Sequence, residues 1–277
     1  MCIRDSLCID YKYPYYRERV LNGEIVTHHF KEDTDIPRGM IHNWLGAVFV
    51  PGAEAVKIAR LLQDFDRHKE IYPEATESRT LGRDGEKVRG FLRFRNKKFI
   101  TVVLNTKHDS YLTRLGDGRY IVKSYSTEIR EVKNPGTPQE MELEPGRDRG
   151  LLWRMNAYWR LEQGDGGVFV ECNVISLTRG IPWIIAWLVK PIVAKFPGEA
   201  LAKTLEKTRQ VAGHLVQQRQ ILLAEGDAGG EGYDQETIDF FLVLQPCGER
   251  GARAVGLLEG AIETGGGNVE SEHAGLL

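Results

Sequence analysis

The stretch that decides the fold is residues 181–220, IPWIIAWLVKPIVAKFPGEALAKTLEKTRQVAGHLVQQRQ. Its first part, 182–189, is apolar on nearly all sides, and a helix of that composition must be covered over most of its surface. After residue 200, apolar or small side chains recur at alternating steps of four and three, which predicts an amphipathic helix with one buried stripe. These positions are Leu201, Leu205, Thr208, Ala212 and Leu215.

Prolines divide this stretch. Pro182 suits the first turn of a helix, where its missing N–H is not needed. Pro191 predicts a kink, and Pro197 with Gly198 predicts a break before the helix resumes.

The composition excludes several classes of protein. Of the 277 residues 42% are hydrophobic, as in an ordinary soluble domain, and the net charge of −2 from 37 basic and 39 acidic residues gives no field that would recruit nucleic acid. The apolar run 181–196 is broken by Lys190, Pro191 and Lys195 and is shorter than the ~20 residues of a bilayer crossing, so we interpret it as a buried helix. The four cysteines and seven histidines are scattered, so we expect no metal site and no cofactor.

Upstream of this helix the sequence predicts a strand, two helices and a series of antiparallel strands. Residues 41–50 read as a strand, 53–65 as an amphipathic helix and 66–72 as a second, short helix. Turn residues separate the later runs, which predicts antiparallel neighbours. The predicted strands are 77–81, 86–95, 99–106, 120–132, 151–161 and 168–177, and 134–149 is predicted to be an irregular loop.

Alternation along these strands assigns one apolar and one polar face to the sheet. Leu92 and Phe94 alternate with arginines, Trp153, Met155 and Trp159 alternate with polar residues, and so do Val170 and Cys172. A sheet with one apolar face needs a cover, and we expect the terminal helix to supply it.

The two ends of the chain differ from its middle. Residues 1–6 resemble a string that arises from sequencing adapter, so we interpret them as non-native and the N-terminus as truncated. We divide the chain into an extension (1–40), a folded domain (41–220) and a glycine-rich tail (221–277) that is either largely disordered or read-through. The sequence does not indicate the cellular compartment. We take it as cytoplasmic by default; the alternative is that a secretion signal was lost with the truncated N-terminus.

This order of elements resembles the START-like or SRPBCC superfamily, which includes lipid-transfer domains and polyketide cyclases. The resemblance is carried by 41–51 leading into a helix, by 62–66 followed by Tyr72-Pro73, by 158–160 with 166–171, and by 176–182 before the helix. It covers roughly residues 41–220 and implies an α+β helix-grip fold. In this fold a curved antiparallel sheet wraps around a long C-terminal helix and leaves a cavity between them.

With the resemblance, the inner face of the sheet is a candidate binding site for a hydrophobic small molecule such as a lipid, an isoprenoid quinone or a polyketide-like aromatic. Pockets of this kind are mostly apolar, with a few polar groups that orient the ligand, and the alternative is a plain packed core. We expect polar contacts from Tyr72 and Tyr125, since a phenol buries its ring and still forms a hydrogen bond. The apolar lining is predicted to be Leu92, Phe94, Trp153, Met155, Trp159, Val170, Cys172, Ile185, Leu188 and Ile192.

Two other functions stay open. In a cyclase or dehydratase, His68 near Asp64 and Asp66, or Tyr125, would perform acid–base work in the same cavity; the simpler interpretation of His68 is a surface histidine. In a scaffold the core would be filled and protein partners would bind the tail, although no stable protein partner is evident.

Charged residues on the strands have simple interpretations as well. Glu171 with Arg154 or Arg160 is either a buried acid with its activating partner or, as we favour, a cross-strand pair on the wet face. The basic stretch 89–98 is expected to be a solvated strand edge. The alternative is contact with lipid headgroups at a membrane surface or with single-stranded nucleic acid, by charge and stacking.

Overall fold

The computed structural model describes residues 15–30, 34–37, 39–96, 101–116, 118–144, 146–179 and 183–229, without the side chains of 34–35, 183–196 and 222–229. Residues 1–243 form one compact unit, to which all of these belong. Residues 1–6 and almost all of the predicted tail therefore lie outside the described residues.

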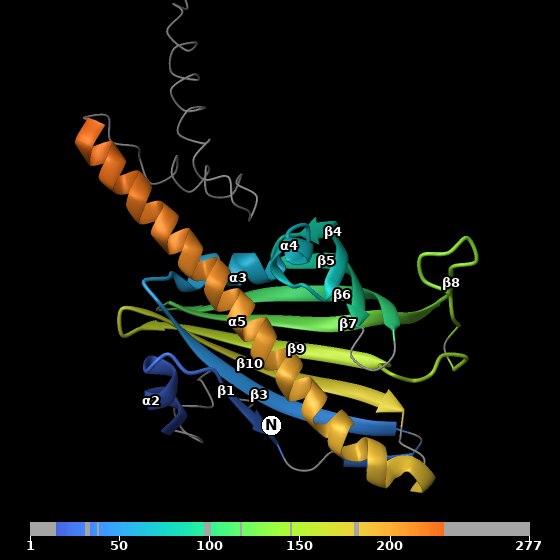
Figure 1. The fold of residues 1–277 in the computed structure, drawn as a ribbon. Helices are drawn as coiled ribbons and strands as arrows, with labels where there is room; N and C mark the ends of the chain where they lie inside the picture. Colours follow the sequence, from blue (N-terminus) through green and yellow to red (C-terminus); the bar gives the residue numbers. More distant parts are fainter. Residues whose placement is uncertain are drawn as a thin grey trace, which may run out of the picture. The chain divides into compact units, whose positions relative to one another are not determined.

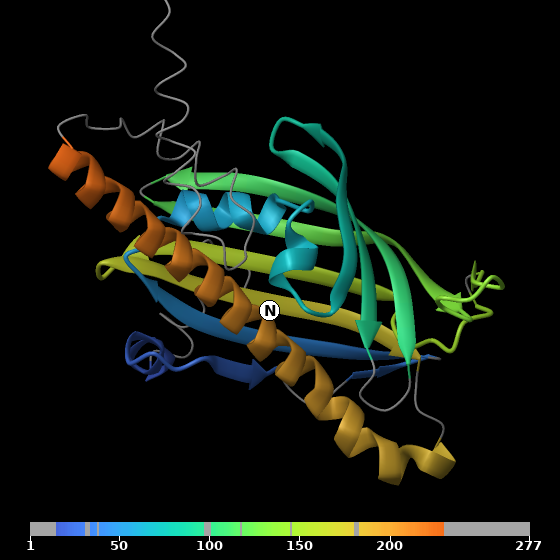
Figure 2. The same ribbon diagram turned by 45° about the horizontal axis from the view of Figure 1, so that its top comes forward.

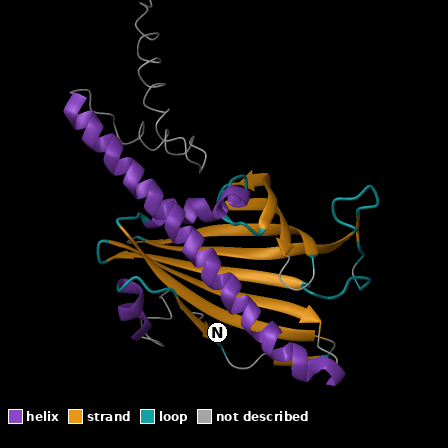
Figure 3. Ribbon diagram, in the orientation of Figure 1, coloured by secondary structure: helices purple, strands orange, loops and turns teal. Residues whose placement is uncertain are grey.

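A long antiparallel sheet and one long helix dominate the described part of the chain (Figures 1 and 3). The helices are α2 (Tyr15–Leu21), α3 (Ala55–Gln63), α4 (His68–Ile71) and α5 (Trp183–Gly229). The first five strands are β1 (Val26–His29), β2 (Thr34–Ile36), β3 (Gly39–Pro51), β4 (Ala75–Asp84) and β5 (Lys87–Asn96). The others are β6 (Val102–Gly116), β7 (Arg119–Lys133), β8 (Met141–Glu142), β9 (Arg154–Gly164) and β10 (Gly167–Arg179).

The strands pair in the order β1-β3-β10-β9-β7-β6-β5-β4, with β2 beside β3 and β8 beside β7. Every pair is antiparallel, as the short turns predicted. α5 crosses one face of this curved sheet diagonally, and α3 lies on the same side (Figure 2). This arrangement confirms the predicted α+β helix-grip fold.

We call the face of the sheet toward α5 the inner face. Its alternating residues, among them Val48, Trp159 and Val170, form the main core together with Leu201 and Leu205 of α5. The amphipathic stripe of α5 was therefore assigned correctly. At roughly 25 cal/mol per Å² of apolar surface, the burial of this stripe is the main force that holds the helix on the sheet.

The predicted break in the terminal helix is wrong, because α5 runs without interruption through Pro197. Its contact with β3 needs a close approach at this level. A Cβ on Gly198 would collide with the Trp44 ring, and a Cβ on Gly46 would come within 2.6 Å of Leu205 Cδ1. Tertiary packing of helix on strand thus outweighs the low helix propensity of the proline–glycine pair.

Strand β6 is much longer than the predicted 99–106. Thr106, His108 and Ser110, in the middle of the strand, are buried on the inner face. An apolar alternation is absent there because the buried positions themselves are polar, and the period-two hydrophobic signal therefore fails.

The face away from α5, the outer face, is not uniformly wet. Next to β3 and β10 it is covered by α2, whose Tyr16 and Val20 pack with Phe49 and Phe169. The Arg17 guanidinium lies over the Phe169 ring, 3.9 Å from its centroid.

A buried ion pair lies on the same outer face. Arg160 Nη1 donates to Glu171 Oε1 over 3.0 Å, and the two side chains are 10% and 0% exposed. The predicted cross-strand pairing is correct, but the wet environment is wrong, because both side chains are buried.

Gly90 on β5 marks a second close approach, because a Cβ there would overlap the Phe65 ring. We expect Gly90→Ala to lower the free energy of unfolding by about 1–3 kcal/mol, as overpacking of a tight core does. Urea unfolding measures the change. Gly164→Ala is the matched control, since its Cβ meets only an ordinary contact at 3.9 Å. Equal urea midpoints for the two variants would contradict this account of the packing.

Candidate functional site

His68 is the first residue of α4 and is buried, with 7% of its surface exposed. Its ring lies 4.8 Å from the Phe65 ring and edge-on to the Tyr72 ring at 5.3 Å. Burial lowers the pKa of the imidazole to about 4, although hydrogen bonds to the backbone of Leu61 and Leu62 oppose this. Its Nε2 is buried without a hydrogen-bond partner.

Tyr72 connects α4 to the terminal helix. Its hydroxyl lies 3.1 Å from Thr208 Oγ1 on α5, and burial raises the pKa of the phenol to about 12. The Thr208 hydroxyl donates to the Thr204 carbonyl at 2.8 Å. Since a threonine hydroxyl has a single proton, Thr208 must accept from Tyr72, which leaves the lone pairs of the Tyr72 oxygen available.

His108 on β6 is the second buried histidine, 3% exposed. Its Nε2 lies 2.9 Å from Thr106 Oγ1, and Thr106 donates its own proton to the Leu92 carbonyl at 3.1 Å. The imidazole must therefore donate from Nε2, and its Nδ1 keeps a lone pair. Burial first, and the neighbouring His68 second, lower the pKa of His108 to about 4.

We call these five residues, His68, Tyr72, Thr106, His108 and Thr208, the His68 cluster. They come from α4, β6 and α5 and lie within an otherwise apolar core. At neutral pH both imidazoles are uncharged and weakly basic, and the phenol is a weak acid. Such groups are far from the pKa that efficient acid–base catalysis needs at pH 7, but they suit the binding of a neutral polar group.

An apolar strip lies next to the His68 cluster on the inner face. It consists of residues that keep partial exposure, whereas their neighbours toward α3 are fully buried. Its members are Phe94, Leu104, Ile129, Met155, Ala157 and Val174. Thr106 pairs directly with Ile129, so the cluster and the strip are continuous.

The predicted lining residues fall into three groups. Trp159, Val170 and Cys172 are in the main core, and burial raises the pKa of the Cys172 thiol well above its ordinary value. Leu92 packs with Phe65, and Phe94 is half-buried beside it. Met155 belongs to the apolar strip, whereas Trp153 donates its indole N–H to Asp148 at 3.1 Å. The side chains of Ile185, Leu188 and Ile192 lie outside the described residues.

Two predicted polar residues need correction. Tyr125 is on the outer face, between the rings of Tyr111 (6.1 Å) and Tyr158 (5.8 Å), and does not share a site with Tyr72. The interpretation of His68 as a surface residue is wrong, because α3 ends at Gln63 and the turn before α4 directs its ring inward.

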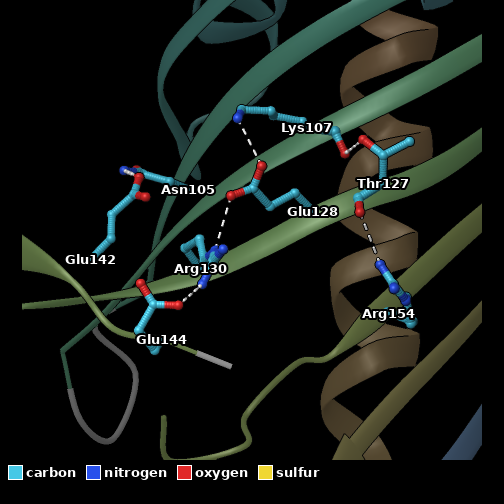
Figure 4. A network of polar contacts seen from close by, with 8 residues as sticks. All are labelled: Asn105, Lys107, Thr127, Glu128, Arg130, Glu142, Glu144 and Arg154. Atoms are coloured by element: carbon cyan, nitrogen blue, oxygen red, sulfur yellow. Dashed lines mark hydrogen bonds and ion pairs between the residues drawn. The ribbon is translucent and has the colours of Figure 1, made fainter. Parts of the chain in front are cut away.

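The basic stretch 89–98 is not a strand edge, since β5 lies between β4 and β6. Arg93 Nη2 pairs with Glu140 at 2.9 Å on the segment that carries β8. Figure 4 shows the adjoining outer-face network, with Glu128 between Lys107 and Arg130. Carboxylates thus neutralise this part of the outer face, including Arg93 of the stretch.

Residues 106, 108 and 208 were missed at the sequence level. The signal that could have found the two on β6 is uncharged polar residues at every second position, alternating with Lys107, Asp109 and Tyr111. A strand with one buried polar side has this pattern. Thr208 was recognised only as part of the helical stripe.

Two further observations concern only the described residues. No group of three or more histidine, cysteine, aspartate or glutamate side chains among them is arranged to hold a metal ion. Nor does any helix in this part of the chain combine the length and apolarity that crossing a bilayer requires.

No protein-family model and no curated protein matches the sequence. Similar solved structures include a STAR-related lipid transfer protein from Xanthomonas axonopodis, 18% identical, with a TM-score of 0.44 over 66% of this chain and 98% of that one. A START superfamily protein from Mycobacterium smegmatis is 12% identical, with a TM-score of 0.42 over 62% and 98% of the two chains. The Zhui aromatase/cyclase from Streptomyces sp. R1128 is 13% identical, with a TM-score of 0.43 over 64% and 96%.

The topology described above defines the fold. A strand, two short helices, an antiparallel sheet and a terminal helix across its inner face give this chain a helix-grip fold.

Proposed function

We propose that this protein binds a hydrophobic small molecule on the inner face of its sheet, beside α5. The observation that carries the proposal is the continuity of the apolar strip with the His68 cluster. The strip offers apolar surface that is not fully buried by the chain itself, and the cluster offers a few polar atoms at one end. This combination is typical of a site that holds a mostly apolar ligand by its body and orients it by its head.

Binding is favoured over catalysis by the protonation states of the cluster. A cyclase or dehydratase needs a base and an acid that exchange protons near neutral pH. His68 and His108, each with a pKa of about 4, and Tyr72, with a pKa of about 12, are poorly matched to that task. The groups are, however, well suited to remain neutral in a site from which water is excluded.

A charge placed on the apolar strip tests this proposal. We expect Met155→Lys to weaken binding of the fluorescent probe N-phenyl-1-naphthylamine by at least tenfold, because an ammonium must be desolvated when the probe covers the strip. The Kd from fluorescence titration of the full chain is the measurement. The matched control is Met141→Lys on β8, where the parent side chain is 55% exposed. Equal Kd values for both variants and the parent chain would refute binding on this face.

The chemical class of a natural ligand can be found on the same material. Native mass spectrometry of the full chain, followed by solvent extraction, should show an apolar adduct that Met155→Lys loses and Met141→Lys keeps. The full chain is required because α2 and β1 pack against the sheet and belong to the folded unit.

A further inference from the structure

The hydrogen positions in the His68 cluster determine which polar group the site accepts. His68 is hydrogen-bonded to the backbone at Leu61 and Leu62, and these bonds favour its protonated form, so the imidazole is the donor in them. Because Nε2 has no partner, the donated proton belongs to Nδ1. Nε2 therefore presents a lone pair in a buried position.

The hydrogen bonds of the other cluster members also leave acceptors free. Thr208 and Thr106 each donate their hydroxyl proton to a backbone carbonyl. Tyr72 and His108 must then donate to these threonines, and each is left with a lone pair. Three neutral side chains therefore each keep an acceptor atom with a lone pair, and none of them keeps a proton that is free to be donated.

We propose that the ligand's polar group is a hydroxyl, of an alcohol or a phenol, which donates its proton to Nε2 of His68, the imidazole that packs edge-on against the Tyr72 ring. This inference rests on the proposed function and specifies the ligand of the same site. The inference distinguishes ligands that have the same apolar part and differ only in the polar group. A quinol or a sterol-like alcohol carries the required donor, whereas the corresponding quinone or ketone has only acceptors and does not fit.

Charged head groups fit less well than a hydroxyl. An ionised carboxylate or phosphate has only acceptor oxygens, and these would lie against the acceptor atoms of the site. An ammonium needs a carboxylate, but Asp109 lies on the outer face, 2.7 Å from Lys87 Nζ, and Asp66 Oδ1 accepts the Thr80 N–H at 2.8 Å. A neutral donor satisfies Nε2 of His68 without bringing a charge into the core.

The test compares probe pairs that differ only in the hydroxyl proton. These are 2-naphthol with 2-methoxynaphthalene, and 1-dodecanol with methyl dodecyl ether, titrated into the full chain by calorimetry. We expect each alcohol to bind at least tenfold more tightly than its ether, because a site with a buried acceptor discriminates strongly against a ligand that leaves it unpaired. Hydrophobicity alone predicts the opposite order, since the ethers are more apolar.

Two variants assign the preference to the cluster. In His68→Phe the ratio between ether and alcohol Kd values should fall to about one, because the ring remains and the lone pair is lost. Tyr72→Phe should reduce the ratio by a smaller factor. Circular dichroism establishes that each variant keeps its fold.

The possible results separate the two proposals. If parent protein binds alcohol and ether equally, the hydroxyl inference is wrong and the proposed binding function stands. If neither member of either pair binds, and N-phenyl-1-naphthylamine does not bind either, the proposed function itself fails. A preference that persists unchanged in both variants would place the acceptor elsewhere and overturn the assignment to His68.

Discussion

Replacing Glu171 by glutamine is expected to lower the free energy of unfolding by about 3–5 kcal/mol, because Arg160 would be left buried without its counter-charge. The two side chains are 0% and 10% exposed, so bulk water does not reach the guanidinium to replace the lost carboxylate. Chemical denaturation with urea gives the free energy directly. A loss of this size is a large fraction of the total stability of a typical domain.

A surface pair provides the matched control for Glu171→Gln. Arg60 binds Glu86 through two hydrogen bonds of 2.6 and 2.9 Å, but these side chains are 49% and 54% exposed. Glu86→Gln should therefore cost less than about 1 kcal/mol. If the two glutamine variants are equally stable, burial does not strengthen the dependence of Arg160 on Glu171.

Removing both charges should be tolerated far better than removing one. The double variant Arg160→Met with Glu171→Leu keeps the volume of the pair and should recover most of the stability that Glu171→Gln loses, since apolar replacements of buried ion pairs are often neutral. A double variant that is less stable than Glu171→Gln would mean that the pair forms bonds that the apolar residues cannot replace.

Acidification is the second large effect. His68 and His108 have pKa values of about 4 in the folded protein, against 6.5 when exposed. Because the folded-state pKa is lowered, the unfolded chain takes up these protons first, and stability falls as the pH drops from about 6.5 toward 4. Between pH 7 and pH 5 the expected loss is about 2 kcal/mol per histidine, or roughly 4 kcal/mol for both.

The pH dependence is measured by urea unfolding at pH 7 and pH 5. In His68→Phe the difference between the two pH values should be about half that of the parent, because one of the two titrating groups is gone. His214→Gln, at an exposed position on α5, controls for the substitution of a histidine as such. A parent protein that is equally stable at both pH values would show that the two rings are not held neutral in the core.

The fold was accessible from sequence because its signals are local. The stripe of α5, the apolar alternation on β9 and β10 and the glycine-rich turns each need only a few consecutive residues, and hydrophobic burial on one face then fixes the register. The continuity of α5 was not accessible, because it depends on contacts between Gly198 and Trp44, which are distant in sequence.

Of the apolar strip, the sequence pointed only to Phe94 and Met155. Trp159, Val170 and Cys172 alternate as inward-facing residues must, but they lie in the main core. The polar part was not predictable, because His68 and His108 are far apart in sequence and are brought together on either side of the Phe65 ring only in the folded protein. Likewise, Arg160 and Glu171 are buried on the outer face, where α2 packs on Phe49 and Phe169, and α2 is too short to give a clear periodic signal.

The pairing of β3 with β10 has a consequence for how the protein is made. During synthesis β3 is complete early, and it contains Val48, Phe49 and Val50, which are buried on both faces in the finished protein. Its partner β10 follows only after the six strands β4 to β9. In a nascent chain that has reached β9, the edge of β3 that pairs with β10 therefore still lacks its partner, and the central pairing of the sheet closes among the last events of folding.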